Sequence, residues 1–130
     1  MSVIPEEYLD LLERPLYGHL ATVRPDGTPQ SNPMWFDWDG EFLYFTNTSR
    51  RQKFRNVTAN PTIALSVVDP DRPVRYLEVR GTVERIEEDP TASTYLRLAK
   101  RYGREQPEAP ADAPYRVTYV VRPTAHSHQG

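Results

Sequence analysis

The sequence contains no cysteine among its 130 residues. This absence excludes a disulfide framework, a thiolate zinc or iron–sulfur site and a cysteine nucleophile. The N-terminal residues lack the basic and apolar segments of a secretory signal, and no stretch approaches the roughly 18 apolar residues of a membrane span. We therefore expect a cytoplasmic protein without membrane contact. The length is typical of one domain, so we expect a single domain over 1–130.

Negative charge is absent from one part of the chain. No acidic residue lies between Glu41 and Asp69, whereas the same stretch holds four cations: Arg50, Arg51, Lys53 and Arg55. The formal net charge of the whole chain is −2. Removing the four cations leaves 12 basic and 18 acidic residues, so an island of +4 stands in a remainder of −6. A chain without a general basic excess is not expected to bind nucleic acid, but the island marks a local cationic site.

Hydrophobic residues are scarce, at 38% of the chain, and their spacing predicts mainly β-structure. Gly81 is expected to mark a bulge or a close backbone approach. The first three strands are joined by turns too short for a parallel crossover, so we expect an antiparallel meander and a closed or half-closed barrel. We expect strands over 17–24, 29–38, 41–47, 62–68, 74–86 and 115–122, helices over 5–14, 49–59 and 89–103, and a mobile tail over 123–130.

A polar and basic segment follows the third predicted strand. Ser49 and Gln52 have the spacing of a capping box, which predicts a helix starting at Ser49. The start of a helix favours anions, so cations there are unexpected unless a phosphate lies between them and the helix dipole. A solvated basic helix face that pairs with acidic neighbours is the alternative, and the segment alone is consistent with both.

A second candidate is the run Asn32-Pro33-Met34-Trp35. Proline cannot donate a ladder hydrogen bond, so Pro33 inside a predicted strand indicates an edge, a bulge or a groove. Such a groove could hold a planar heterocycle against Met34 and Trp35, although an ordinary hairpin with a large core aromatic is the favoured interpretation of the run taken alone. The three histidines lack the spacing of a metal site, and no catalytic triad or phosphate-binding glycine loop occurs.

Several ordered segments resemble the pyridoxamine 5′-phosphate oxidase-like flavoprotein superfamily. They cover nearly the whole chain: 18–30, Pro33 to Phe36, 44–53, Asn60-Pro61, and Tyr76 to Gly81. The resemblance implies a six-stranded antiparallel split β-barrel with short flanking helices. It also implies a homodimer with two cofactor sites at its interface. Within the superfamily, the short chain is most similar to the branch that binds the deazaflavin coenzyme F420 in place of FMN.

The resemblance also assigns site residues. Arg51 and Lys53 match the phosphate-binding basic pair, with Thr46, Thr48, Ser49 and Arg50 beside them. Asn32, Pro33, Met34 and Trp35 match the strand along the tricyclic ring, and Tyr76 matches a position that reaches the site from the second subunit. No catalytic residue is assigned and no metal is expected.

Three functions follow from the resemblance. The first is an F420-dependent oxidoreductase that transfers a hydride between the deazaflavin and a small organic substrate. The second is an FMN-binding oxidoreductase or flavin reductase on the same fold. The third is a non-enzymatic protein that carries or senses a flavin or deazaflavin. In each, the cofactor supplies the chemistry and the protein supplies position and environment.

Overall fold

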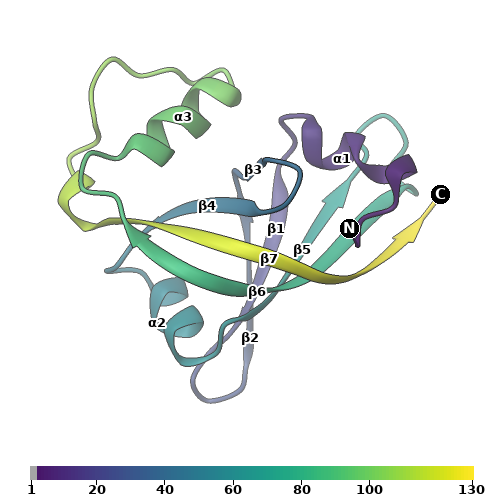
Figure 1. Ribbon diagram of the computed structural model, residues 1–130, viewed down its shortest axis with the longest axis horizontal. Coiled ribbons are helices and arrows are strands. Elements are labelled where there is room, and N and C mark those ends of the chain that lie inside the picture. Colours follow the sequence, from purple (N-terminus) through teal and green to yellow (C-terminus); the bar gives the residue numbers. More distant parts are fainter. Residues whose placement is uncertain (1–2) are drawn as a thin grey trace.

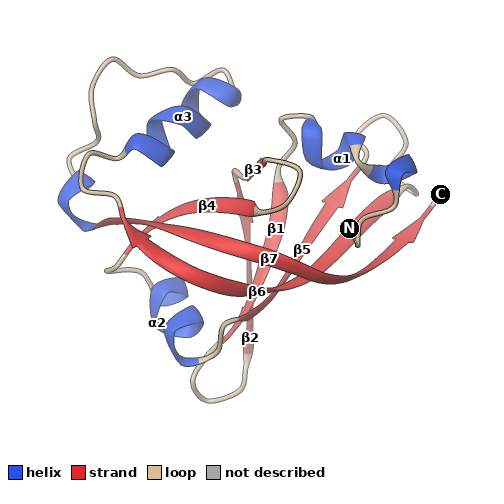
Figure 2. Ribbon diagram, in the orientation of Figure 1, coloured by secondary structure: helices blue, strands red, loops and turns tan. Residues whose placement is uncertain are grey.

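The computed structural model describes residues 3–130 and contains one antiparallel sheet with short helices around it (Figure 1). Figure 2 shows the strands crossing the centre of the molecule, with α1 and α3 at opposite ends. Within these residues no helix is long and apolar enough to cross a membrane. In chain order the elements are η1 (Glu6–Tyr8), α1 (Asp10–Glu13), β1 (Gly18–Val23), β2 (Pro29–Met34), β3 (Asp37–Trp38), β4 (Leu43–Thr48), α2 (Gln52–Ala59), β5 (Thr62–Val68), β6 (Tyr76–Glu88), α3 (Ser93–Arg101), η2 (Ala113–Tyr115) and β7 (Arg116–Gln129).

The sheet has seven strands in the order β2-β1-β5-β6-β7-β4-β3, so the split-barrel class is confirmed but the count of six strands is corrected. The stretch predicted as one strand over 29–38 is divided, because β2 pairs with β1 whereas β3 pairs with β4 at the other edge. Phe36 is fully buried where the chain passes between them. The expected meander of the first three strands is wrong for the same reason: β4 pairs with β3 and β7, not with β2.

The two longest strands, β6 and β7, are paired along most of their length (Figure 1). Their register shifts between Arg80 and Gly81, which confirms the predicted irregularity. A Cβ on Gly81 would lie 2.6 Å from the carbonyl oxygen of Arg122, so the close backbone approach requires glycine. The mobile tail expected over 123–130 is wrong, because residues 125–129 pair with residues 76–80 and complete the hydrogen bonding of β6.

One face of the sheet carries the core. Leu20, Leu65 and Val79 lie in register on β1, β5 and β6 and are almost fully buried. The helix predicted over 5–14 forms as two short pieces, η1 and α1, and α1 buries Leu11 and Leu12 against this face. Burial of such side chains contributes about 1.5–3 kcal/mol each, which compensates for the low apolar fraction of the sequence.

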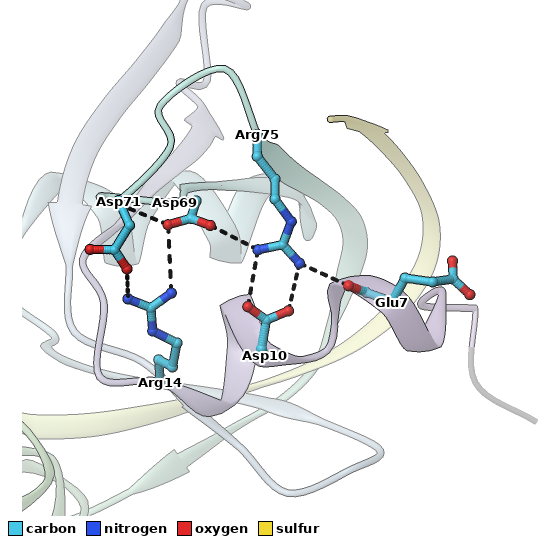
Figure 3. Close-up of polar contacts among 6 residues, drawn as sticks. All are labelled: Glu7, Asp10, Arg14, Asp69, Asp71 and Arg75. Atoms are coloured by element: carbon cyan, nitrogen blue, oxygen red, sulfur yellow. Dashed lines mark hydrogen bonds and ion pairs between the residues drawn. The ribbon is translucent and has the colours of Figure 1, made fainter.

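An ionic cluster joins α1 to the β5–β6 connection (Figure 3). The guanidinium of Arg75 donates to both carboxylate oxygens of Asp10, at 2.6 and 3.0 Å, and to Asp69 at 3.0 Å. It also donates to the carbonyl oxygen of Glu7 at 2.8 Å. Arg14 adds an ion pair with Asp71 at 3.0 Å. One arginine therefore fixes the N-terminal helical segment to the end of the sheet that lies farthest from α3.

Candidate functional site

The candidate site lies on the face of β4 and β7 that is turned away from the core. The register pairs Thr46 with Thr118 and Thr48 with Arg116, so these four side chains share that face. The helix α3 covers it: the hydroxyl of Thr118 donates to the hydroxyl of Thr94 at 2.8 Å.

Asp89 fixes the start of α3. Its carboxylate accepts the backbone N–H groups of Ser93 and Thr94 at 2.9 and 3.0 Å. The helix predicted over 89–103 therefore begins at Ser93, with Asp89 capping it from four residues before. This cap holds Tyr95, the aromatic residue of α3, above the sheet.

A cavity of about 210 Å³ lies between Tyr95 of α3 and the neighbouring strands, and we call it the aromatic cavity. The ring of Trp35 stacks on Tyr102, with centroids 5.3 Å apart and planes 13° apart, and its centroid lies 6.1 Å from that of Tyr95. Such contacts hold the rings in fixed positions. The cavity is lined by Tyr17, Pro33, Met34, Trp35, Thr46, Tyr95 and Arg116.

The predicted residues Pro33, Met34, Trp35 and Thr46 thus come together around one space. Pro33 lies on β2, which is an edge strand of the sheet, in agreement with its expected position.

Tyr102 fixes the wall of the aromatic cavity from behind. Its hydroxyl accepts the backbone N–H of Phe36 at 3.1 Å and donates to the carbonyl oxygen of Leu16 at 2.7 Å. Burial raises the pKa of the phenol, so the hydroxyl stays protonated and able to donate. Because Leu16 and Phe36 adjoin Tyr17 and Trp35 in the sequence, one hydroxyl positions two of the aromatic side chains of the wall.

A second cavity, of about 320 Å³, lies beyond the end of β4, and we call it the Ser49 cavity. The backbone N–H of Ser49 donates to the carbonyl oxygen of Tyr115 at 2.9 Å, which holds the chain against the last residue of η2, directly before β7. Arg116 lines both cavities and separates them. The walls of the Ser49 cavity are formed by Ser49, Phe54, Ile86, Glu88, Pro90, Pro114, Tyr115, Arg116 and Val117.

The predicted capping box is wrong. Because the backbone N–H of Ser49 stays bonded to Tyr115 of η2, the helix α2 begins at Gln52, and the N-cap residue Arg51 has an extended backbone and makes no side-chain cap. The side chain of Gln52 instead donates to Asn56 at 2.9 Å. Arg50 and Arg51 therefore precede the helix, and only Lys53 and Arg55 lie in its first turn.

The four cations of the basic island have different surroundings. The guanidinium of Arg50 lies 3.4 Å from the ring centroid of Tyr115, a cation–π contact, and Arg55 donates to Gln52. Among residues 3–130, the side chains of Arg51 and Lys53 have no hydrogen-bond acceptor or carboxylate partner. Burial, together with the charge of Arg51, lowers the pKa of Lys53. An anion beside these two cations would relieve that repulsion.

The remaining predicted residues line neither cavity. Thr48 is buried beside Arg116. Asn32 is turned to the opposite face of β2 from Pro33, where it accepts a hydrogen bond from Gln30 at 2.8 Å. Tyr76 starts β6, 12 residues before Glu88 at the end of the strand that borders the Ser49 cavity. At about 3.3 Å per residue, that separation is about 40 Å along the strand.

Four residues at the aromatic cavity are absent from the set predicted by sequence. Tyr17 was placed only in the strand predicted over 17–24, and Tyr95 and Tyr102 only in the helix predicted over 89–103. Arg116 was overlooked, although it begins a strand of buried residues, where a cation is unusual. The structure shows how it is held: Asp112 accepts hydrogen bonds from its Nε and Nη2 at 3.0 and 3.1 Å.

Comparison with known proteins identifies the family. The pyridoxamine 5′-phosphate oxidase family matches residues 4–129, and the chain belongs to it. Among solved structures, one named F420 Reductase is 65% identical, with a TM-score of 0.93 over 95% of this chain and 98% of that chain. The resemblance to the F420 branch is therefore confirmed.

More distant structures share the fold. General Stress Protein 26 from Bacillus anthracis is 25% identical, with a TM-score of 0.71 over 95% of this chain and 92% of that one. The conserved hypothetical protein Rv2991 from Mycobacterium tuberculosis is 21% identical, with a TM-score of 0.76 over 98% and 85%, a likeness of fold alone. No curated protein sequence matches the chain.

Proposed function

We propose that the protein is an F420-dependent oxidoreductase that transfers a hydride between the deazaflavin and a small organic substrate. The observation that carries this proposal is the 65% identity to a structure named F420 Reductase across nearly all of both chains. The residues of the site fit such a cofactor. The aromatic cavity offers flat apolar walls to a ring, and Arg51 and Lys53 are cations without a carboxylate partner among the described residues.

In this proposal the roles divide between the two parts of the site. Asn32, Pro33, Met34 and Trp35 belong to the strand along the ring. The phosphate is held by Arg51 and Lys53, with Thr46, Thr48, Ser49 and Arg50 as supporting positions. When bound, the deazaflavin supplies the hydride chemistry. The protein excludes water and fixes the geometry, and no side chain needs to act as a nucleophile.

We also propose that the protein is a homodimer. Within one chain Tyr76 lies at the opposite end of β6 from the Ser49 cavity, so it can contribute to that cavity only from a second copy. The outer face of β1, β5 and β6 is available for such pairing, because its side chains, including His19, Ser66 and Glu78, point away from the core. Light scattering at micromolar concentration should give twice the chain mass, and a monomer would contradict this part of the proposal.

The phosphate assignment is tested by Lys53→Ala. Loss of a charge-assisted contact of about 1.5–3 kcal/mol should weaken F420 binding at least about tenfold in a fluorescence titration. Lys100→Ala is the matched control, because Lys100 is the only other lysine of the chain and is exposed on α3. An unchanged affinity in Lys53→Ala would refute the assignment.

The choice of cofactor and the activity need two further measurements. Titration of the wild-type protein with F420 and with FMN shows which one it prefers; tighter binding of FMN would favour the flavin alternative. Turnover of the reduced cofactor with a panel of quinones and enones then separates an enzyme from a carrier. Binding without turnover of any acceptor would favour the carrier.

A further inference from the structure

We propose that Arg116 is a ring-binding residue of this site, which donates from Nη1 to a carbonyl oxygen of a planar heterocycle in the aromatic cavity. The inference rests on the proposed function and extends it to a residue outside the assigned set. Its first support is the place of Arg116, which among the described residues is the one that lines both the aromatic cavity and the Ser49 cavity.

The donors of Arg116 are divided between structure and cavity. Asp112 accepts from Nε and Nη2, which occupies one edge of the guanidinium. The remaining terminal nitrogen, Nη1, lies 3.4 Å from the hydroxyl oxygen of Thr46, a long contact that leaves donor capacity unused. Since Thr46 lines the aromatic cavity, Nη1 is the donor on that side.

The guanidinium is also held in one plane. Its central carbon lies 4.5 Å from the ring centroid of Tyr95, and only 13% of the side chain is exposed. A cation clamped by a carboxylate on one edge and an aromatic ring on one face loses little freedom when it binds a ligand. The arrangement is therefore built for a directed hydrogen bond.

The charge balance around Arg116 favours a carbonyl oxygen over a phosphate. Asp112 offsets the positive charge, so a phosphate gains less here than beside Arg51 and Lys53, which have no such partner. Binding of a neutral ring carbonyl depends more on a hydrogen-bond donor in a fixed position than on the net charge of the site. Where the ring can ionise, the nearby guanidinium still favours its anionic form and lowers its pKa.

The test separates ring contacts from phosphate contacts. The probes are F420 and the fragment of it that contains the deazaflavin ring and the ribityl chain but no phosphate. The variant is Arg116→Gln combined with Asp112→Asn, which leaves no unpaired carboxylate. Arg122→Gln is the control, because Arg122 lies on the same strand and pairs with Glu84 on the exposed side.

We expect the double variant to bind both probes about tenfold more weakly, and the pKa of the bound ring, followed by absorbance against pH, to rise. Lys53→Ala should weaken F420 only, and Arg122→Gln should bind both probes as the wild type does. Arg116→Lys keeps the charge but lacks the planar fork, so it should recover only part of the affinity. It also provides a second variant if circular dichroism shows that the first does not fold.

The outcomes distinguish the inference from the proposed function. If the wild type binds both probes and the folded Arg116 variants bind them equally well, with an unshifted ring pKa, the inference is overturned and the proposed function stands. If the wild type binds neither probe, the proposed function fails and the inference fails with it.

Discussion

Replacing Tyr102 by phenylalanine should loosen the wall of the aromatic cavity without removing its ring stack. The substitution deletes one oxygen that accepts from the N–H of Phe36 and donates to the carbonyl of Leu16. Phe36 is fully buried, so its N–H would be left without a partner. An unpaired backbone group costs about 1–3 kcal/mol. Because Leu16 is only half-buried and water can replace part of its bond, we expect a total loss of about 2–3 kcal/mol.

Urea unfolding at one fixed protein concentration measures this loss. With a slope of about 1–3 kcal/mol per molar for a chain of this size, the midpoint should fall by about 0.7–3 M. The urea midpoint of Tyr102→Leu should fall further, because the aromatic stack on Trp35 contributes about 0.5–1.5 kcal/mol beyond its buried area. Tyr115→Phe is the control: Tyr115 is 40% exposed and its hydroxyl has no partner among the described residues.

The result that would refute the reasoning is a stable Tyr102→Phe protein. A free energy of unfolding within about 0.5 kcal/mol of the wild type would mean that the hydroxyl does not hold Phe36 and Leu16 in place. Weaker F420 binding with unchanged stability would also contradict the argument, because it would assign the hydroxyl to the ligand and not to the wall.

Two further predictions concern stability. A hydrogen bond from Arg75 holds the pKa of Asp10 below its ordinary value, so this carboxylate stabilises the fold above about pH 4 and loses its contribution as the pH falls. In Arg75→Gln, the melting temperature followed by circular dichroism should therefore fall less steeply at acid pH than in the wild type. An unchanged acid dependence would argue against the linkage. Asn56→Ala should cost about 2–3 kcal/mol in urea unfolding, because the fully buried amide donates to Thr22 and accepts from Gln52; a loss under about 0.5 kcal/mol would show that water replaces both bonds.

The periodicity of the sequence predicted most strands but not how they pair. Strand β5 was predicted over 62–68 and is observed there, because its alternating apolar residues meet a single core. The division of 29–38 was missed because local pattern does not show that the chain changes sheet edge at Phe36. The paired tail was missed for a related reason: its polar residues are ordered by the backbone of β6, not by their own burial.

The site was predictable to the extent that it follows local motifs. The resemblance identified Pro33, Met34, Trp35 and Thr46, which line one cavity. Arg116 and Tyr95 were not identified, because they reach the cavity from segments more than 45 residues later in the chain, through a strand register and a helix placement that the sequence does not display. The capping box failed because a tertiary hydrogen bond from Ser49 to Tyr115 of η2 competed with the local signal.

The placement of the two tryptophans should allow ligand binding to be followed by the intrinsic fluorescence of the protein. Both lie within four residues, yet Trp35 forms part of the cavity wall whereas Trp38 packs against the core. A ligand that enters the aromatic cavity should therefore change the emission of one indole and leave the other as an internal reference. Trp35→Phe separates the two signals, so occupancy can be followed without a dye and without a chromophoric ligand.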